Sequence, residues 1–575
     1  MLFPRRNRFR QLFELPAIWE IAFDPEDVGR QRDWRRGLSE SQPIAVPASW
    51  NDQFAEWRDF LGPAWYQTRF FVPSAWLKSK IFLRFGSVNY LAEAWLNGET
   101  LGVHEGGHLP FEFDITEFVH LDENLLILRV DGRLGNDTVP PGNLDPQEVV
   151  ASNLPYPNTS FDFFPFCGIQ RPVSIYTVSK NHLSDITVST DALGSSSILH
   201  IQWVTGLEKE ETVRIHLTDG EQDILHESQK GEADIEIRNA RLWSPTTPYL
   251  YILRIEVLEG DKPVDSYSLP VGVRTISVEG DTLLLNGKPV YLRGFGRHED
   301  FPVYGRGYAP PVIVKDFDLM RWVGANSFRT SHYPYAEEQL DLADRLGFLV
   351  IDETPAVGLF FKNELGLKKR NALCRQMLRE IIQRDRNHPS VIMWSLANEP
   401  RSDHSRTAKF FRELYDLAYK LDGTRPVTVA RHARMADDSY EFLDVISLNL
   451  YYGWYQQQGQ LQEGFERLRQ ELENVYRRFR KPVLLTEFGA DALPGHHAQP
   501  PEMFSEEYQA ALLEGYLQVL KEIPYVVGKH IWNLCDFKTG QAVHRMQGMN
   551  YKGIFTRDRR PKLAAHRVRK LWKEG

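Results

Sequence analysis

The chain has 575 residues, a formal net charge of −9, 42% hydrophobic residues and 25% charged residues. This length exceeds what one hydrophobic core supports, so we expect two to four domains. The acidic balance excludes broad nucleic-acid binding, which needs a basic surface. The sequence contains no apolar run of about 18 residues, so we expect no membrane-spanning helix.

Cysteine usage points to a reducing compartment. Cys167, Cys374 and Cys535 are odd in number, far apart and without the spacing of metal ligands. The pattern favours buried free thiols. The segment Met1–Arg10 is basic but has no apolar segment behind it, so it does not predict a secretory signal. We therefore expect a cytoplasmic protein.

Residues 1–180 have the pattern of a β-sandwich. Short strands are predicted at Trp65–Val72, Ile81–Phe85 and Leu91–Leu96. The last of these runs into Asn97-Gly98, a strong hairpin signal between alternating segments. Since no convincing amphipathic helix interrupts the strands, we expect a sandwich of the jelly-roll, sugar-binding type.

Residues 181–275 continue as short, regularly spaced strands. Apolar and polar residues largely alternate in Ser197–Val204, Thr212–Leu217 and Tyr249–Val257. About 95 residues of such strands are typical of an immunoglobulin-like sandwich.

Residues 276–575 alternate between strands and helices. Eight strands are predicted, at Val290–Gly294, Ser327–Arg329, Phe348–Ile351, Val391–Ser395, Val427–Val429, Val445–Leu448, Val483–Thr486 and Val526–Trp532. Helical patterns lie between them, at Asn371–Arg386, Thr407–Leu421, Leu461–Phe479 and Glu506–Ile523. Eight such units predict an α/β (TIM) barrel. The alternative is a doubly wound open sheet, which the missing glycine-rich phosphate loop disfavours.

Polar residues follow the predicted barrel strands, where the active sites of such barrels lie. Glu399 follows the fourth strand and Glu487 the seventh, and other strands end in Arg297–Asp300, Arg329–Tyr333, Asp352–Glu353, Asn449–Tyr452 and Trp532–Asp536. Burying so many charged groups in one ring of loops is costly unless they pair or react. The pattern therefore indicates a catalytic site.

Two carboxylates across a cleft are what acetal hydrolysis requires. One donates a proton to the leaving oxygen while the other attacks the anomeric carbon, so their pKa values must differ. Arg329 or Tyr451 beside the attacking carboxylate would keep it anionic and oriented. Alternatively, Arg329 pairs with a barrel aspartate and Tyr451 packs in a layer of the barrel interior.

At these residues the chain resembles glycoside hydrolase family 2. Asn326–Pro334 and Asp385–Glu399 are similar to the two signatures of the family, and the order of the three domains is the family's order. The resemblance implies a retaining mechanism without a metal or an organic cofactor. It also implies Glu399 as acid/base, Glu487 as nucleophile, and Asn398 as a ligand of the sugar 2-hydroxyl.

Within the family the chain looks like the β-glucuronidase subgroup. Asn449–Tyr455 is similar to a stretch with active-site tyrosines, here Tyr451 and Tyr455, and Asn550-Tyr-Lys552 is similar to an Asn-x-Lys motif that binds the sugar's C6 carboxylate. An ammonium and an amide suit a carboxylate, and a neutral sugar would leave the lysine unpaired. A solvated surface lysine is the alternative for Lys552.

The resemblance implies four further ligands and an open site. Asp162 would reach a sugar hydroxyl, His332 and Trp532 would line the sugar site, and Arg545 would lie near the carboxylate, although Met546–Met549 is one residue longer than the family's spacing. Some bacterial relatives have a long loop after the third strand. Here Val357–Lys369 is short, which predicts an open aglycone side.

Together these features predict a retaining exo-β-glucuronidase that acts on small-molecule or oligosaccharide β-glucuronides, with no nucleic-acid or membrane partner. The resemblance also implies a homo-oligomer, either a dimer or a tetramer. Three alternatives stay open: β-galacturonidase activity, another activity of the family such as that of a β-galactosidase or β-mannosidase, and a non-catalytic carbohydrate-binding protein.

Overall fold

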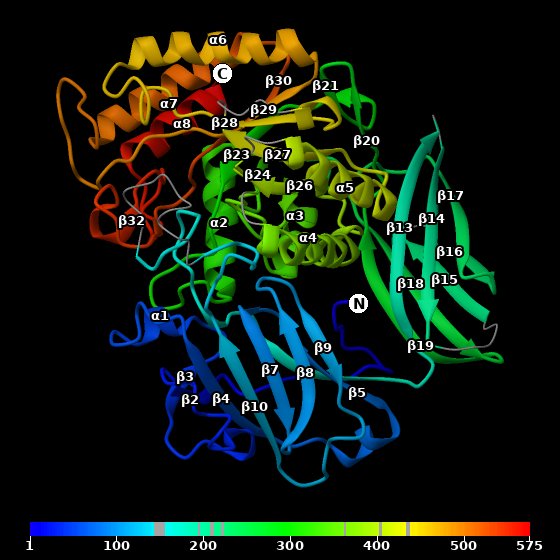
Figure 1. Cartoon of the computed structure of the whole chain (residues 1–575). Helices are drawn as coiled ribbons and strands as arrows, with labels where there is room; N and C mark the ends of the chain where they lie inside the picture. The colour runs from blue at the N-terminus through cyan, green and yellow to red at the C-terminus, as the bar shows by residue number, and fades with distance from the viewer. Residues whose placement is uncertain are drawn as a thin grey trace.

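The structure is a computed structural model, and three bodies follow one another along the chain (Figure 1). It describes residues 1–142, 156–193, 196–206, 212–219, 223–361, 364–401, 405–432 and 438–574. The two sandwiches lie against the barrel, one below it and one beside it in the view of Figure 1. This arrangement confirms the predicted fold class.

The first sandwich packs a four-stranded sheet on a six-stranded sheet. The smaller sheet has the order β1 (Leu12–Glu14), β12 (Val173–Val178), β5 (Lys80–Phe85) and β9 (Phe111–Asp114). The larger has the order β3 (Gln42–Ala45), β2 (Ile18–Phe23), β4 (Pro63–Phe70), β10 (Asn124–Asp131), β7 (Leu91–Leu96) and β8 (Glu99–Glu105). Smaller elements are β6 (Val88–Asn89), β11 (Gly168–Ile169) and the one-turn helix α1 (Trp50–Gln53).

The predicted hairpin at Asn97-Gly98 is confirmed. β7 and β8 pair antiparallel on either side of it. Asn97 has φ 54° and Gly98 has φ 85°. The type I′ turn of a two-residue hairpin requires positive φ at both positions, which asparagine and glycine tolerate best.

The second sandwich has three strands facing four. One sheet has the order β13 (Leu183–Leu193), β14 (Ser196–Thr205) and β17 (Glu232–Arg238); the other has β16 (Asp223–Ser228), β15 (Thr212–Thr218), β18 (Tyr251–Glu259) and β19 (Lys262–Val271). Along β15 every second residue is buried, so the alternation in the sequence marks the inner face of the sandwich.

A small sheet of β20 (Ile276–Glu279), β21 (Thr282–Leu285) and β22 (Lys288–Pro289) precedes the barrel. Eight parallel strands then close on themselves: β23 (Leu292–Gly296), β24 (Ser327–Arg329), β25 (Leu349–Glu353), β26 (Val391–Asn398), β27 (Val427–His432), β28 (Ile446–Asn449), β29 (Val483–Glu487) and β30 (Val526–Ile531). The closed ring rules out the doubly wound open sheet. All eight predicted strands are present.

Helices surround the barrel, as the labels in Figure 1 show. The four predicted helices are present as α4 (Glu364–Asp385), α5 (Ser405–Leu421), α6 (Leu461–Phe479) and α7 (Glu506–Lys521). Three more were not predicted: α2 (Pro310–Val323), α3 (Glu337–Leu346) and α8 (Leu563–Glu574). A hairpin of β31 (Phe537–Lys538) and β32 (Met549–Asn550) follows the last barrel strand.

The first sandwich is anchored in the barrel by aromatic residues. Phe161 and Phe163 belong to the same buried apolar cluster as the barrel core. The Phe163 ring lies 5.0 Å from that of His298, centroid to centroid. Arg171 donates to Glu299 at 3.0 Å. Asp162, between the two phenylalanines, is thereby held at the carboxyl end of the barrel strands.

Cys167, Cys374 and Cys535 are buried free thiols, as predicted. Among the described residues, no helix is both long enough and apolar enough to cross a membrane.

Candidate active site

Two glutamates at the ends of barrel strands line one cavity of about 430 Å³. Glu399 comes directly after β26, where the pairing with β27 shifts register between Ser395 and Asn398. Its φ of 44° is unusual for a residue with a side chain, and such backbone strain gathers at functional sites. The half-buried Glu399 accepts a hydrogen bond from Asn449 at 2.9 Å.

Glu487 is the last residue of β29 and is 4% exposed. Tyr451 donates its hydroxyl hydrogen to Glu487 at 2.7 Å. On the other side the guanidinium of Arg329 donates to the same carboxylate. These contacts hold both carboxylate oxygens of Glu487 in fixed directions.

Arg329 serves two carboxylates at once. Besides Glu487 it donates to the fully buried Glu353 at 2.7 and 2.8 Å. His332 lies 2.9 Å from Glu353 through Nδ1, and its ring stacks on Trp532 at 4.8 Å between centroids. Arg329 therefore contacts the candidate nucleophile and also pairs with a barrel carboxylate, which is Glu353 and not the aspartate of the structural alternative.

The electrostatics of Glu487 differ from the expectation. Burial raises the pKa of the Glu487 carboxyl above its ordinary value, and Arg329 and His332 offset this only in part. For Glu353 burial acts in the same direction, but Arg329 and His332 outweigh it and lower the pKa. Because Arg329 divides its charge between two carboxylates, it orients Glu487 more than it acidifies it.

A second group of charges lies in the wall of the same cavity. Arg545 donates to Asp162 at 2.7 and 2.9 Å, and Asn550 donates to the same carboxylate at 2.7 Å. Burial would raise the pKa of Asp162, but Arg545 outweighs it and lowers the pKa. Arg545 also donates to the hydroxyl of Tyr455 at 2.9 Å.

Lys552 is 1% exposed, so the surface-lysine alternative is wrong. Its ammonium donates to Asp491 and, at 3.0 Å, to the hydroxyl of Tyr455. The backbone N–H of Tyr551 donates to Asp491 at 2.7 Å. The expectation that a neutral sugar would leave Lys552 unpaired is therefore also wrong, because Asp491 is its buried partner.

Ten of the twelve predicted site residues line the cavity, namely Asp162, His332, Asn398, Glu399, Tyr451, Tyr455, Glu487, Trp532, Arg545 and Asn550. Arg329 and Lys552 do not line the cavity themselves. Arg329 donates a hydrogen bond to Glu487, and Lys552 donates one to Tyr455, and both acceptors line the cavity. Between Arg545 and Asn550 the chain turns at Gln547 and Gly548, which have positive φ.

Three residues that contact the predicted site residues have no role assigned from the sequence. Glu353 and Asn449 are among the predicted strand-end residues, but their partners could not be predicted. Asp491 comes four residues after Glu487, and nothing local marks it as the partner of Lys552. Val357 and Gly358 of the short loop line the cavity, whereas residues 362 and 363 of that loop lie outside the described part of the chain.

Comparison with known families covers all three bodies. Residues 276–574 match the family described as "Glycosyl hydrolases family 2, TIM barrel domain". Residues 12–179 match its sugar binding domain, and residues 171–274 match "Glycosyl hydrolases family 2".

The chain belongs to glycosyl hydrolase family 2.

Among the relatives of this family 2 chain, a β-glucuronidase of Paenibacillus borealis is 41% identical, with 100% of this chain and 99% of the relative covered. One of Rattus norvegicus is 40% identical, with 100% and 92% covered. A solved β-glucuronidase of an uncultured Clostridium sp. has a TM-score of 0.94 and 39% identity, with 100% of both chains covered. One of Ruminococcus gnavus, solved with D-glucuronic acid, has a TM-score of 0.93 and 36% identity, with 100% and 99% covered.

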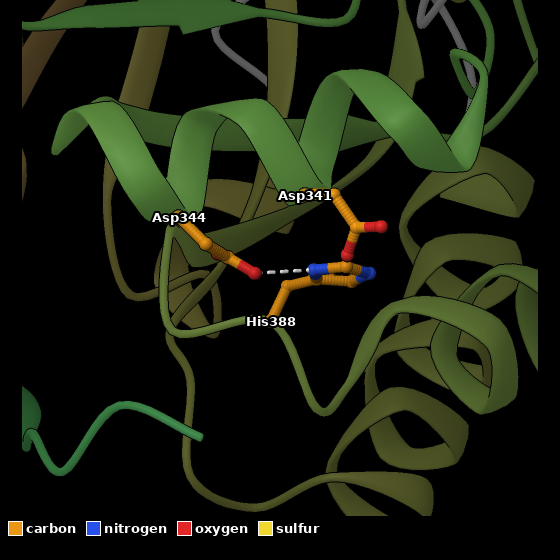
Figure 2. Close-up of side chains that lie close together, drawn as sticks. All are labelled: Asp341, Asp344 and His388. Atoms are coloured by element: carbon orange, nitrogen blue, oxygen red, sulfur yellow. Dashed lines mark hydrogen bonds and ion pairs between the residues drawn. The ribbon is translucent and has the colours of Figure 1, made fainter. Parts of the chain in front are cut away.

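One cluster in the described part of this family 2 chain has the side chains of a metal site: Asp341 and Asp344 of α3 and His388 before β26 (Figure 2). Both oxygens of Asp344 are already engaged, by His388 Nδ1 at 2.6 Å and by the backbone N–H of Ser390 at 3.0 Å. Burial would lower the pKa of His388, but Asp344 outweighs it and raises the pKa to about 9. An imidazolium cannot ligate a cation, so this cluster is a structural ion pair.

We expect the His388–Asp344 pair to stabilise the family 2 barrel in a pH-dependent way. The folded pKa, about 9, is above the ordinary 6.5. The stabilisation is therefore complete below pH 6.5 and is lost as the pH rises to about 9, with a total on the order of 3 kcal/mol. Urea unfolding of wild type and His388→Gln should show a difference in stability at pH 6 that largely disappears at pH 9.5. An equal difference at both pH values would contradict the ion pair.

Proposed function

We propose that the chain is a retaining exo-β-glucuronidase. The observation that supports this most directly is one cavity that holds two strand-end glutamates, Glu399 and Glu487, and a buried cationic wall at Arg545 and Lys552. Relatives that match over the whole chain include β-glucuronidases. The sugar would lie between these two groups, with C1 toward the glutamates and C6 toward the cations.

In the first step Glu487 attacks C1 while Glu399 protonates the glycosidic oxygen, and the aglycone leaves. In the second step Glu399 removes a proton from water, which attacks C1 and releases the sugar with its original β configuration. Tyr451 and Arg329 hold the Glu487 oxygens in position for the attack. The raised pKa of Glu487 makes the carboxylate more basic, which suits a nucleophile as long as it is ionised.

Retention requires carboxyl groups about 5–5.5 Å apart, whereas inverting enzymes separate them by about 6.5–9.5 Å. Proton NMR during hydrolysis of an aryl β-glucuronide tests this. We expect β-glucuronic acid as the first product, which then mutarotates. If the α-anomer appears first, the mechanism is inverting and Glu487 is not a nucleophile.

The subsite at C6 is formally neutral before substrate binds, because Arg545 and Lys552 face Asp162 and Asp491. A sugar carboxylate would therefore share cations that already have partners. We propose that Asn550, Arg545 and Lys552 contact the carboxylate, and that Asp162 contacts a hydroxyl and positions Arg545. Charge-assisted hydrogen bonds of this kind give the carboxylate its advantage over a neutral hydroxymethyl group.

One panel of chromogenic β-glycosides tests the substrate class. It should contain the glucuronide, galacturonide, galactoside, glucoside and mannoside of one phenol. We expect the glucuronide to be hydrolysed with the highest kcat/KM. A preference for the galacturonide, whose sugar differs from glucuronic acid only at C4, would identify the chain as a β-galacturonidase. A preference for a neutral sugar would indicate another family 2 activity. Absence of hydrolysis throughout would indicate a non-catalytic carbohydrate-binding protein.

We further propose an open aglycone side, on the basis of the short segment after β25. Val357 and Gly358 lie at the cavity, and α4 begins at Glu364. An open site favours long or bulky aglycones. The ratio of kcat/KM for an oligosaccharide ending in glucuronic acid to that for a small aryl glucuronide tests this, and a much lower value for the oligosaccharide would contradict it.

A further inference from the structure

A second polar cavity, of about 220 Å³, lies where the immunoglobulin-like domain meets the barrel. The sandwich contributes Ser189 and Asp191, and the chain that leads into the barrel contributes Arg274 and Thr275. Loops before β26 and β27 contribute Arg386 and Arg425. Because these loops precede their strands, the cavity lies at the opposite end of the barrel from Glu399, which follows β26.

Arg274 is the unusual residue of this cavity. It is 5% exposed, and among the described residues its guanidinium donates only to the backbone carbonyls of Pro389 and Val391, at 3.1 and 2.8 Å. No carboxylate of the described residues forms an ion pair with it. Burial and the nearby charge of Arg425 lower the pKa of Arg274 to about 9, and the carboxylates of Asp422 and Asp344 offset this only in part. A buried guanidinium without a counter-charge is costly.

The other two arginines have carboxylates of their own. Arg386 pairs with Asp185 and Arg425 with Asp422, each at 2.6 Å. The Nε of Arg386 is buried without an acceptor among the described residues. Their charges are therefore balanced, and the charge of Arg274 is left over.

Asp191 does not supply the missing charge. Its side chain is 66% exposed at the edge of the cavity and interacts with His200 at 3.1 Å. A carboxylate in that position is screened by water and compensates a buried cation poorly. The buried part of the cavity thus has an excess of one positive charge, with unused N–H donors on the arginines and hydroxyl groups on Ser189 and Thr275.

We propose that this cavity binds one small oxyanion of the phosphate or sulfate class between the two domains. Guanidinium groups present paired N–H donors that match the oxygens of such an anion. The volume is that of several water molecules, each about 30 Å³, so a tetrahedral anion fits. The bound anion would neutralise Arg274 and join the immunoglobulin-like domain to the barrel. The proposal is independent of the sugar site.

Titration calorimetry of the full chain with inorganic phosphate, at constant ionic strength in chloride, tests this site. We expect saturable binding of one phosphate per chain. Arg274→Gln should weaken the binding about tenfold or more, since it removes charge-assisted hydrogen bonds. Arg386→Gln should weaken phosphate binding as well. If the Arg274→Gln variant does not fold, the Arg386→Gln variant tests the site in its place. Arg214→Gln is the matched control: this arginine pairs with Glu227 on the sandwich surface, and its loss should leave binding unchanged.

Two results would overturn the proposal. One is the absence of saturable phosphate binding by the wild-type chain. The other is binding that survives in a folded Arg274 or Arg386 variant but is lost in Arg545→Ala, because the phosphate would then occupy the sugar cavity. Competition by D-glucuronic acid separates the two locations: an anion at the domain junction is not displaced by the sugar.

Discussion

Replacing Glu487 by alanine is expected to lower kcat on an aryl β-glucuronide by at least about four orders of magnitude, as loss of a nucleophile does in other covalent mechanisms. Without this carboxylate no covalent glycosyl intermediate can form. The variant should still fold, because the remaining partners of Arg329 include the fully buried Glu353 at 2.7 Å. Steady-state kinetics and circular dichroism measure the two effects.

Glu399→Gln is the informative comparison, since its effect should depend on the leaving group. A phenol with a low pKa leaves without protonation, so this variant should retain the first step with an activated aryl glucuronide and release its first equivalent of phenol as a burst. Glu487→Ala should show no burst with any substrate. Near-normal turnover by Glu487→Ala would remove Glu487 from its proposed role, and a burst from both variants would place the nucleophile elsewhere.

Replacing Lys552 by alanine is expected to reduce the preference for glucuronide over glucoside about a hundredfold or more, measured as the ratio of the two kcat/KM values. Two effects act together. The substrate carboxylate loses an ammonium partner. Asp491 loses its nearest cation, Lys552, and keeps only Arg545 at 3.6 Å, so its buried charge repels the substrate more strongly. A neutral glucoside experiences only the loss of packing.

Lys538→Ala is the matched control for that experiment. Lys538 also belongs to the segment after the last barrel strand and also pairs with a carboxylate, that of the half-buried Asp52 at 2.6 Å. Asp52 does not line the sugar cavity, whereas Tyr455, to which Lys552 donates, does. Loss of Lys538 should leave the ratio unchanged. The double variant Lys552→Ala/Asp491→Asn should recover part of the glucuronide activity, because it removes the repulsion. Equal loss on glucuronide and glucoside in Lys552→Ala would mean that the lysine has a purely structural role.

Local patterns in the sequence predicted much of the architecture. Residues alternate in β15 because only one face of this strand is buried, so every second side chain is apolar. The barrel strands are buried on both faces, so their residues form continuous apolar runs. The places where the strands end followed from the same pattern. Glu399 and Glu487 could therefore be assigned to one end of a barrel from local patterns alone.

Charge pairing required the tertiary structure. Lys552 and Asp491 are 61 positions apart, and Arg329 and Glu487 are 158 apart, so no local pattern relates them. The same holds for the raised pKa of Glu487, which depends on the depth of its burial, and for the unpaired charge of Arg274 at the domain junction. The sequence by itself determined the eight barrel strands, four of the helices around them and the end of the barrel that holds the carboxylates. Only the tertiary structure decided which charges compensate one another, because electrostatic energy depends on distance and burial in space and not on position along the chain.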